Sequence, residues 1–251
     1  MQRTASRLTR LLACAAVPVM LVVAGCSSDA GSGDGGGGKA KTGAGADAGS
    51  GTGGEAATPS PKPKPTVEAA RFAKLPQACQ AVTEKTTGAL VPKAKAPKGT
   101  AASSTDLALR GGCSWNGLED KGVKGSQYRW LDVSFYRYDS EASLGSGQDR
   151  ARENFEKEVA KVQATENAQK VSTAATPGIG DEAKTVTYTV RKTGEDFVYS
   201  SVVARTGNVL VLLTYNGTGY WGAAEPELKK VVEGSATAAK EAVASVAAAN
   251  K

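Results

Sequence analysis

Residues 128–138 read YRWLDVSFYRY, and this stretch decides the fold. Leu131, Val133 and Phe135 alternate with polar and aromatic residues, which is the two-residue period of a β-strand with one apolar face. A second stretch, VLVLL at residues 209–213, is apolar at every position, which predicts a central strand buried on both faces. The two stretches together indicate a sheet with further elements packed against it.

Periodicity and turn residues predict the elements around these strands. A helix is expected over residues 148–163, where the apolar side chains form one stripe, and a short helix over residues 78–86, after Pro76 and before Gly88. Strands are expected over residues 183–191, 196–205 and 208–215. A last helix opens at Pro226. Its core stripe is Leu228, Val231, Val232, Ala239, Ala242, Val243 and Val246. This order predicts a single α+β domain in which an antiparallel sheet packs with about three helices.

The first 25 residues have the pattern of a bacterial secretory signal. Three arginines precede an apolar run of residues 11–24, which is too short for a spanning helix. The run ends Val-Ala-Gly-Cys at residues 23–26, which resembles a lipobox, the motif whose cysteine takes a diacylglycerol before cleavage. We therefore expect lipidation at Cys26, the alternative being a free or disulfide-bonded cysteine after an ordinary signal peptide.

The next segment has the composition of a tether. Residues 27–66 contain 12 Gly and 4 Pro and no aliphatic residue larger than alanine, so they cannot form a core. A spacer is the main interpretation, with wall-polymer contact or glycosylation as the alternative. The predicted organisation is a signal peptide over residues 1–25, a lipid-anchored disordered tether over 26–66 and a globular domain over 67–251.

The remaining cysteines predict a disulfide. Cys14 leaves with the signal peptide and Cys26 is used by the lipid, so Cys79 and Cys113 remain as a pair. Export to an oxidising compartment favours a bond between them. The alternative, a redox dithiol, normally uses a compact C-x-x-C motif, from which this pair departs.

Composition excludes several function classes. The chain has no histidine, which removes the Ser-His-Asp and Cys-His nucleophile systems and most zinc sites. The formal charge is +6, but without the three signal arginines 28 basic and 25 acidic residues remain, a net of +3 with the signs interspersed. A nucleic-acid ligand is therefore not expected, and no cofactor or metal is expected either.

Three motifs together resemble a known family. They are the cysteine-containing first helix, GCSW at residues 112–115, and GIGDEA at residues 178–183 ahead of a strand meander. The chain resembles actinobacterial surface lipoproteins of domain-of-unknown-function family 3558 over residues 74–249. The resemblance implies an exported α+β domain with a lipid anchor. It implies no activity, so no catalytic residue is carried over.

Four aromatic residues share one side of the strand expected over residues 128–138. Tyr128, Trp130, Tyr136 and Tyr138 alternate with the apolar positions and so face away from them. Two interpretations are open: a helix covers them as a second core face, or they form a recognition surface for a glycan, a lipid or a protein.

Two other groups are weaker candidates. Gly178 and Gly180 are not followed by a helix, so a turn is expected there instead of a phosphate loop. Asp181 and Glu182 are neighbours in an extended segment and should point to opposite faces, so a solvated loop is expected instead of a cation site.

The sequence therefore predicts a non-catalytic binding or interaction module. It would be held on the extracytoplasmic face of the cell membrane by its lipid anchor, with an envelope protein, a glycan or a lipid as ligand. One alternative is an envelope hydrolase that uses carboxylates around Asp132, which requires a second acid in the same cleft. Another is an accessory subunit of a signalling or transport complex.

Overall fold

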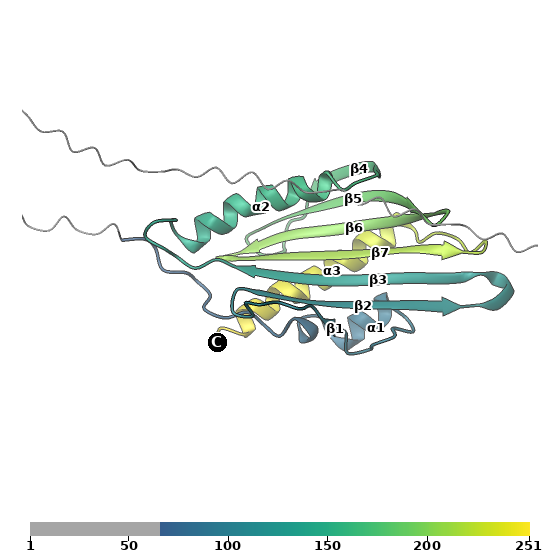
Figure 1. Ribbon diagram of the computed structural model, residues 1–251, viewed down its shortest axis with the longest axis horizontal. Coiled ribbons are helices and arrows are strands. Elements are labelled where there is room, and N and C mark those ends of the chain that lie inside the picture. Colours follow the sequence, from purple (N-terminus) through teal and green to yellow (C-terminus); the bar gives the residue numbers. More distant parts are fainter. Residues whose placement is uncertain (1–65) are drawn as a thin grey trace, which may run out of the picture. The chain divides into compact units, whose positions relative to one another are not determined.

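The computed structural model describes residues 66–251 (Figure 1). The predicted signal peptide, Cys26 and the tether up to residue 65 lie outside the described residues. The domain has one antiparallel sheet of seven strands in the order β1-β2-β3-β7-β6-β5-β4. The strands are β1 (Thr100–Ala101), β2 (Arg110–Asp120), β3 (Ser126–Arg137), β4 (Ala168–Ala175), β5 (Glu182–Lys192), β6 (Glu195–Thr206) and β7 (Val209–Tyr220).

Helices pack against both faces of this sheet. They are α1 (Glu84–Leu90), α2 (Gly147–Gln163) and α3 (Leu228–Ala248), with short 3-10 turns η1 (Ala78–Gln80) and η2 (Gly122–Lys124). In Figure 1, α2 lies along the β4–β6 side of the sheet, and α3 crosses the opposite face, where it contacts β6 and β7. The predicted α+β class, with an antiparallel sheet and three helices, is confirmed.

The main core lies between the sheet and α3. Leu131, Val133 and Phe135 of β3 are fully buried there, as their alternation predicts. The apolar residues 209–213 lie in β7, which is the middle strand of the sheet, as predicted for a central buried strand. On α3 the contact is made by small residues, among them Ala238 and Ala242, which let the helix lie close to the strands. Leu228, predicted in this stripe, is instead about half exposed at the first position of α3.

The prediction for the cysteine pair is confirmed, and the prediction for the first helix is partly wrong. Cys79 and Cys113 are disulfide-bonded, as predicted, and join η1 to β2. The helix expected over residues 78–86 is wrong in its bounds, because the chain extends after η1 and α1 begins only at Glu84. Thr83 is its N-cap and accepts a hydrogen bond from the amide of Thr86 at 3.3 Å, while Gly88 lies within the helix and not at its end.

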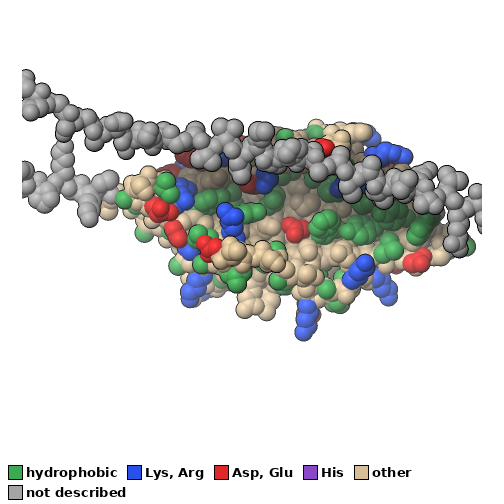
Figure 2. Space-filling view, in the orientation of Figure 1, with side chains coloured by type: hydrophobic (Ala, Val, Ile, Leu, Met, Phe, Trp, Pro, Cys, Tyr) green, Lys and Arg blue, Asp and Glu red, His purple; other side chains and the backbone are tan. Residues whose placement is uncertain are grey.

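The second face of the sheet is covered only in part. Phe155, Val159 and Val162 of α2 pack over β5, β6 and β7 in a second apolar cluster. The predicted stripe of this helix is thereby confirmed. β2 and the adjoining side of β3 lie beyond the helix, and Figure 2 shows hydrophobic side chains gathered over the sheet on this face. Within residues 66–251, no helix covers this part of the face.

The sequence did not predict the edge strand β4. Its residues are almost all exposed, so they carry no apolar alternation. Asn167 and Lys170 also have positive φ, and the pairing with β5 shifts register between Gln169 and Ser172. An exposed edge strand with an irregular register leaves little periodic signal in the sequence.

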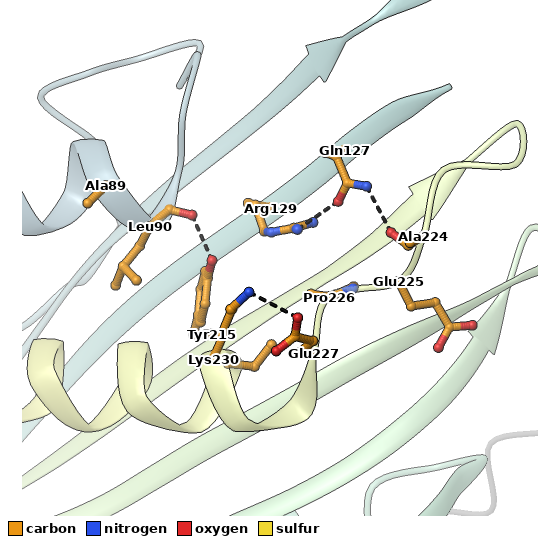
Figure 3. Close-up of a pocket in the computed structure, with 11 residues that line it drawn as sticks. Ala89, Leu90, Gln127, Arg129, Tyr215, Ala224, Glu225, Pro226, Glu227 and Lys230 are labelled. Atoms are coloured by element: carbon orange, nitrogen blue, oxygen red, sulfur yellow. Dashed lines mark hydrogen bonds and ion pairs between the residues drawn. The ribbon is translucent and has the colours of Figure 1, made fainter. Parts of the chain in front are cut away.

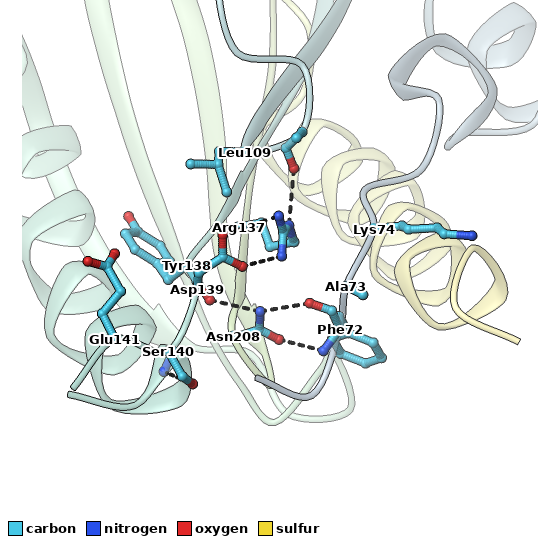
Figure 4. Close-up of polar contacts among 12 residues, drawn as sticks. Phe72, Ala73, Lys74, Leu109, Arg137, Tyr138, Asp139, Ser140, Glu141 and Asn208 are labelled. Atoms are coloured by element: carbon cyan, nitrogen blue, oxygen red, sulfur yellow. Dashed lines mark hydrogen bonds and ion pairs between the residues drawn. The ribbon is translucent and has the colours of Figure 1, made fainter. Parts of the chain in front are cut away.

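One buried asparagine joins the beginning of the domain to the sheet (Figure 4). Asn208, in the turn between β6 and β7, accepts a hydrogen bond from the amide of Phe72 at 2.8 Å. Its own amide donates to the carbonyl oxygens of Phe72 and Tyr138, both at 2.9 Å. Because Asn208 is fully buried, these bonds satisfy groups that water does not reach.

The acidic neighbours at the beginning of β5 correct part of a prediction. Asp181 is exposed in a bend, as the expected solvated loop requires, but Glu182 is the first residue of β5. The two were expected to point to opposite faces, yet both contact the guanidinium of Arg205, Asp181 at 3.3 Å. Arg71 also pairs with Asp181, at 3.5 Å. The preceding glycines do form a turn, as predicted, and Gly180 has a positive φ that brings Asp181 toward β6. The cluster is therefore an ion-pair network that ties β5 to β6.

Candidate functional site

A pocket opens on the partly covered face of the sheet, beside the C-terminal end of α2. Its volume is about 400 Å³. Strands β3, β5, β6 and β7 form its floor, and the residues that follow α2 form one wall. It is lined by Trp130, Asp132, Thr165, Glu166, Tyr188, Val190, Lys192, Tyr199, Thr214 and Asn216.

The sheet register brings these side chains together. Trp130 of β3 lies opposite Asn216 of β7, and Asn216 lies opposite Tyr199 of β6. Tyr199 in turn lies opposite Tyr188 of β5. Directly opposed residues point to the same face of a sheet, so the four form one row across four strands. Asp132 and Thr214 are opposed in the next row.

Aromatic rings form the apolar part of the pocket. The rings of Tyr188 and Tyr199 are stacked, with centroids 4.7 Å apart and an interplanar angle of 9°. The ammonium group of Lys192 lies 5.3 Å from the centroid of the Tyr199 ring and donates to the hydroxyl of Tyr199 at 2.9 Å. Trp130 is 40% exposed, so its indole presents free surface to a ligand.

Asn216 has one of the three buried side-chain oxygen atoms of residues 66–251 that lack a hydrogen-bond partner. The residue is only 2% exposed, and no group of residues 66–251 donates a hydrogen bond to its Oδ1 atom. A buried acceptor without a partner costs about 1–3 kcal/mol. Asn216 lines the pocket but its Oδ1 atom is buried, so a ligand donor would satisfy this atom after a small shift of the side chain.

Asp132 supplies the second oxygen acceptor. Burial raises the pKa of its carboxyl group, and a hydrogen bond from the Ser134 hydroxyl at 3.4 Å acts in the opposite direction. The neighbouring Thr214 hydroxyl is already bonded to Ser201, at 2.9 Å. Asp132 is therefore held in a partly desolvated position, where hydrogen bonds to a ligand are stronger than in water.

The four predicted aromatic residues do not act as one surface. Only Trp130 lines the pocket. Tyr128 makes an edge-on contact with Phe197, with centroids 6.0 Å apart, and both lie in or against the second apolar cluster. Tyr136 and Tyr138 also pack against that cluster, and Tyr138 follows the last residue of β3. The three tyrosines therefore fit the interpretation of a second core face, and a recognition surface at Trp130 stays a prediction.

Sequence reasoning missed most of the pocket. Tyr188, Val190 and Lys192 alternate along β5, which is a detectable signal for one shared face. Tyr199 and Asn216 carry no such signal, because their strands are almost entirely buried on both faces. Only the pairing of strands distant in sequence brings Asn216 beside Trp130.

Two kinds of feature are absent from residues 66–251. No helix in this range is both long enough and apolar enough to span a bilayer. The same range holds no cluster of three or more histidine, cysteine, aspartate or glutamate side chains placed to bind a metal ion.

Comparisons with known proteins found little. No family model matches the chain, and no curated protein matches it. Among solved structures, it is similar to LpqN, described as involved in cell envelope biogenesis of Mycobacterium tuberculosis. The identity is 13%, the match covers 55% of this chain and 71% of LpqN, and the TM-score is 0.28. A TM-score this low does not establish a common fold, and the resemblance to family 3558 stays a prediction.

Proposed function

We propose that the chain is an extracytoplasmic, lipid-anchored binding module that holds a neutral saccharide ring in the pocket beside α2. The observation that carries the proposal is the unpartnered Oδ1 atom of Asn216 in a pocket with aromatic walls. Ligand sites typically combine apolar walls with a few placed polar groups. Here the polar groups are mainly acceptors, which favours a ligand with several donors.

A sugar ring fits both the aromatic and the polar groups of this pocket. Its C–H face would lie on the free indole of Trp130, and its hydroxyl groups would donate to Asn216 and Asp132. Charges of both signs line the pocket, Asp132 and Glu166 against Lys192, so neither a strong anion nor a strong cation is favoured. The ammonium group of Lys192 beside the stacked tyrosines opposes a cationic ligand in particular.

The predicted lipid anchor gives this module its location. Two acyl chains at Cys26 would give stable attachment to a membrane, and a tether of 40 residues spans about 35 Å as a flexible coil. The disulfide between Cys79 and Cys113 supports export, because disulfides persist in oxidising compartments.

Binding of methyl glycosides to the purified full-length protein tests the ligand class. Calorimetric titration with a panel of neutral methyl glycosides should identify at least one that saturates. Trp130→Ala should weaken it about tenfold or more, because the stacking surface is lost. Trp221→Ala is the matched control, since Trp221 is 73% exposed and does not line the pocket. Failure of every glycoside to bind, or equal losses in both variants, would reject the proposal.

A second candidate function rests on one specific observation. Asp132 and Glu166 both line the pocket, and burial raises the pKa of Asp132. A carboxyl group with a raised pKa beside a second, exposed one is the arrangement that acid-base hydrolysis of a glycoside uses. Nitrophenyl glycosides would report turnover. A hydrolase would lose turnover in Asp132→Asn while still binding the glycoside, whereas a binding module shows no turnover in either form.

A further inference from the structure

A second cavity lies on the opposite face of the sheet, between β3, β7, α1 and the beginning of α3 (Figure 3). Its volume is about 390 Å³. Arg129 of β3 and Tyr215 of β7 lie on its sheet side, and Lys230 lies on its α3 side. The cavity does not share a lining residue with the saccharide pocket.

Arg129 is the unusual residue of this cavity. Six of the eight arginines in residues 66–251 have a carboxylate oxygen within 4 Å of the guanidinium. The other two are Arg110, which is exposed, and Arg129, which is half-buried. The Arg129 guanidinium instead donates from Nη1 to the carbonyl oxygens of Tyr128 at 2.7 Å and Thr218 at 3.3 Å, and from Nη2 to Oε1 of Gln127 at 2.7 Å. Its positive charge is therefore held in place but not neutralised.

Glycines of β7 create the space for this arginine. Gly217 lies directly opposite Arg129, and a Cβ atom on Gly217 would come within 2.7 Å of Arg129 Cδ. A Cβ atom on Gly219 would come within 2.2 Å of the Ala223 carbonyl oxygen, so this glycine lets the segment before α3 fold back over the strand. Gln127 then fixes that segment through a bond from its amide to the Ala224 carbonyl at 2.8 Å. Two missing side chains thus shape the cavity around Arg129.

The other charges around the cavity leave Arg129 without a carboxylate partner. Lys230 pairs with Glu227 at 3.0 Å, and in Figure 3 the carboxylate of Glu225 points away from Arg129. Glu227 is the N-cap residue of α3, but its side chain makes no capping hydrogen bond, and the first turn of the helix holds no acidic residue. The positive end of the helix dipole therefore lies beside the cavity, which Glu227 and Lys230 line.

We propose that this cavity binds an oxyanion, the phosphate or carboxylate group of a ligand, with Arg129 as its principal contact. The Nε–H and the second Nη2–H of the planar guanidinium make no hydrogen bond within residues 66–251, so they can donate to either group. Lys230 and the positive end of the α3 dipole add electrostatic attraction from the other side. This inference does not depend on the saccharide pocket, because the two cavities lie on opposite faces of the sheet.

Calorimetric titration of the purified full-length protein with inorganic phosphate, and separately with acetate, tests the proposal at constant ionic strength. We expect saturable binding by the wild type and a loss of about tenfold or more in Arg129→Gln. Arg152→Gln is the matched control: it removes the same charge from an exposed ion pair on α2 and should leave binding unchanged. Tighter binding of phosphate than of acetate indicates a phosphate-bearing ligand, and the reverse order indicates a carboxylate.

A second variant, at an exposed residue, keeps the proposal testable if Arg129→Gln does not fold. Lys230 is largely exposed, so Lys230→Gln should fold normally and weaken binding by a few-fold, because a nearby cation is lost and Glu227 is freed. The absence of saturable binding to either anion would overturn the proposal. Unchanged affinity in a folded Arg129→Gln, or equal losses in the Arg129 and Arg152 variants, would overturn it as well.

Discussion

The three tryptophans of this chain form a natural series for testing whether Trp130 is available to a ligand. Their exposed fractions are 2% for Trp115, 40% for Trp130 and 73% for Trp221. Truncation of a fully buried tryptophan to alanine costs about 3–5 kcal/mol, so this is the expected loss for Trp115→Ala. Trp221→Ala should change the free energy of unfolding by less than about 0.5 kcal/mol.

Trp130→Ala should fall between these values. A side chain of about 250 Å² that is 40% exposed buries roughly 150 Å², and alanine recovers part of that area. At about 25 cal/mol per Å², the net loss is about 2 kcal/mol, which is an upper value because the unfolded chain also buries some surface. Urea unfolding followed by far-ultraviolet circular dichroism measures all three variants. A loss for Trp130 equal to that of Trp115 would mean that the indole is fully used in packing, and the stacking surface would not exist.

Four other substitutions have defined outcomes. Cys26→Ala should release the protein from the membrane fraction, and retention after a carbonate wash would contradict the lipid anchor. Cys79→Ser should lower the free energy of unfolding by about 3–4 kcal/mol, because the bond closes a sequence separation of 34 residues, and should leave Cys113 reactive toward a thiol reagent. Asn208→Ala should cost about 3–5 kcal/mol, since it strands three buried backbone groups, as equilibrium denaturation can measure. Burial raises the pKa of Asp132 in the folded state, so the free energy of unfolding falls as the pH rises from the ordinary carboxyl pKa through the raised one. Asp132→Asn should therefore stabilise the fold at neutral pH. Thermal melts should show that this gain vanishes in acid.

The fold could be predicted from the sequence because its helices and strands carry strong local hydrophobic patterns. The alternation along β3, the unbroken apolar run of β7 and the stripe of α2 each report burial directly. The disulfide followed from elimination among four cysteines. The failures occurred where the local pattern carries no burial signal. Strand β4 is exposed along its length, and Asp181 and Glu182 are bound by Arg205, which comes from the next strand in the sequence.

The candidate site was harder to predict from the sequence, because it depends on the pairing between strands. Trp130 and Asp132 are neighbours on one strand face in the sequence pattern, and the pocket contains both. Their partners Tyr199 and Asn216 come from β6 and β7, which are separated from β3 by α2, β4 and β5 along the chain. Sequence spacing alone does not reveal which of many alternating residues will be opposed in such a register.

The end of β7 shows how one short segment can serve both faces of the sheet. After its apolar run, the strand continues as NGTG over residues 216–219, which breaks the hydrophobic pattern without ending the strand. Alternation directs Asn216 to the α2 face, where its Oδ1 atom lacks a partner, and places Gly217 on the α3 face, where Arg129 occupies the vacant space. Glycine weakens a strand interior, so its presence at two such positions needs a compensating reason, and close packing of Arg129 and of the segment before α3 provides one. The polar and glycine-rich extension of β7 therefore lies beside both proposed sites, and it is visible in the sequence before the strand partners are known.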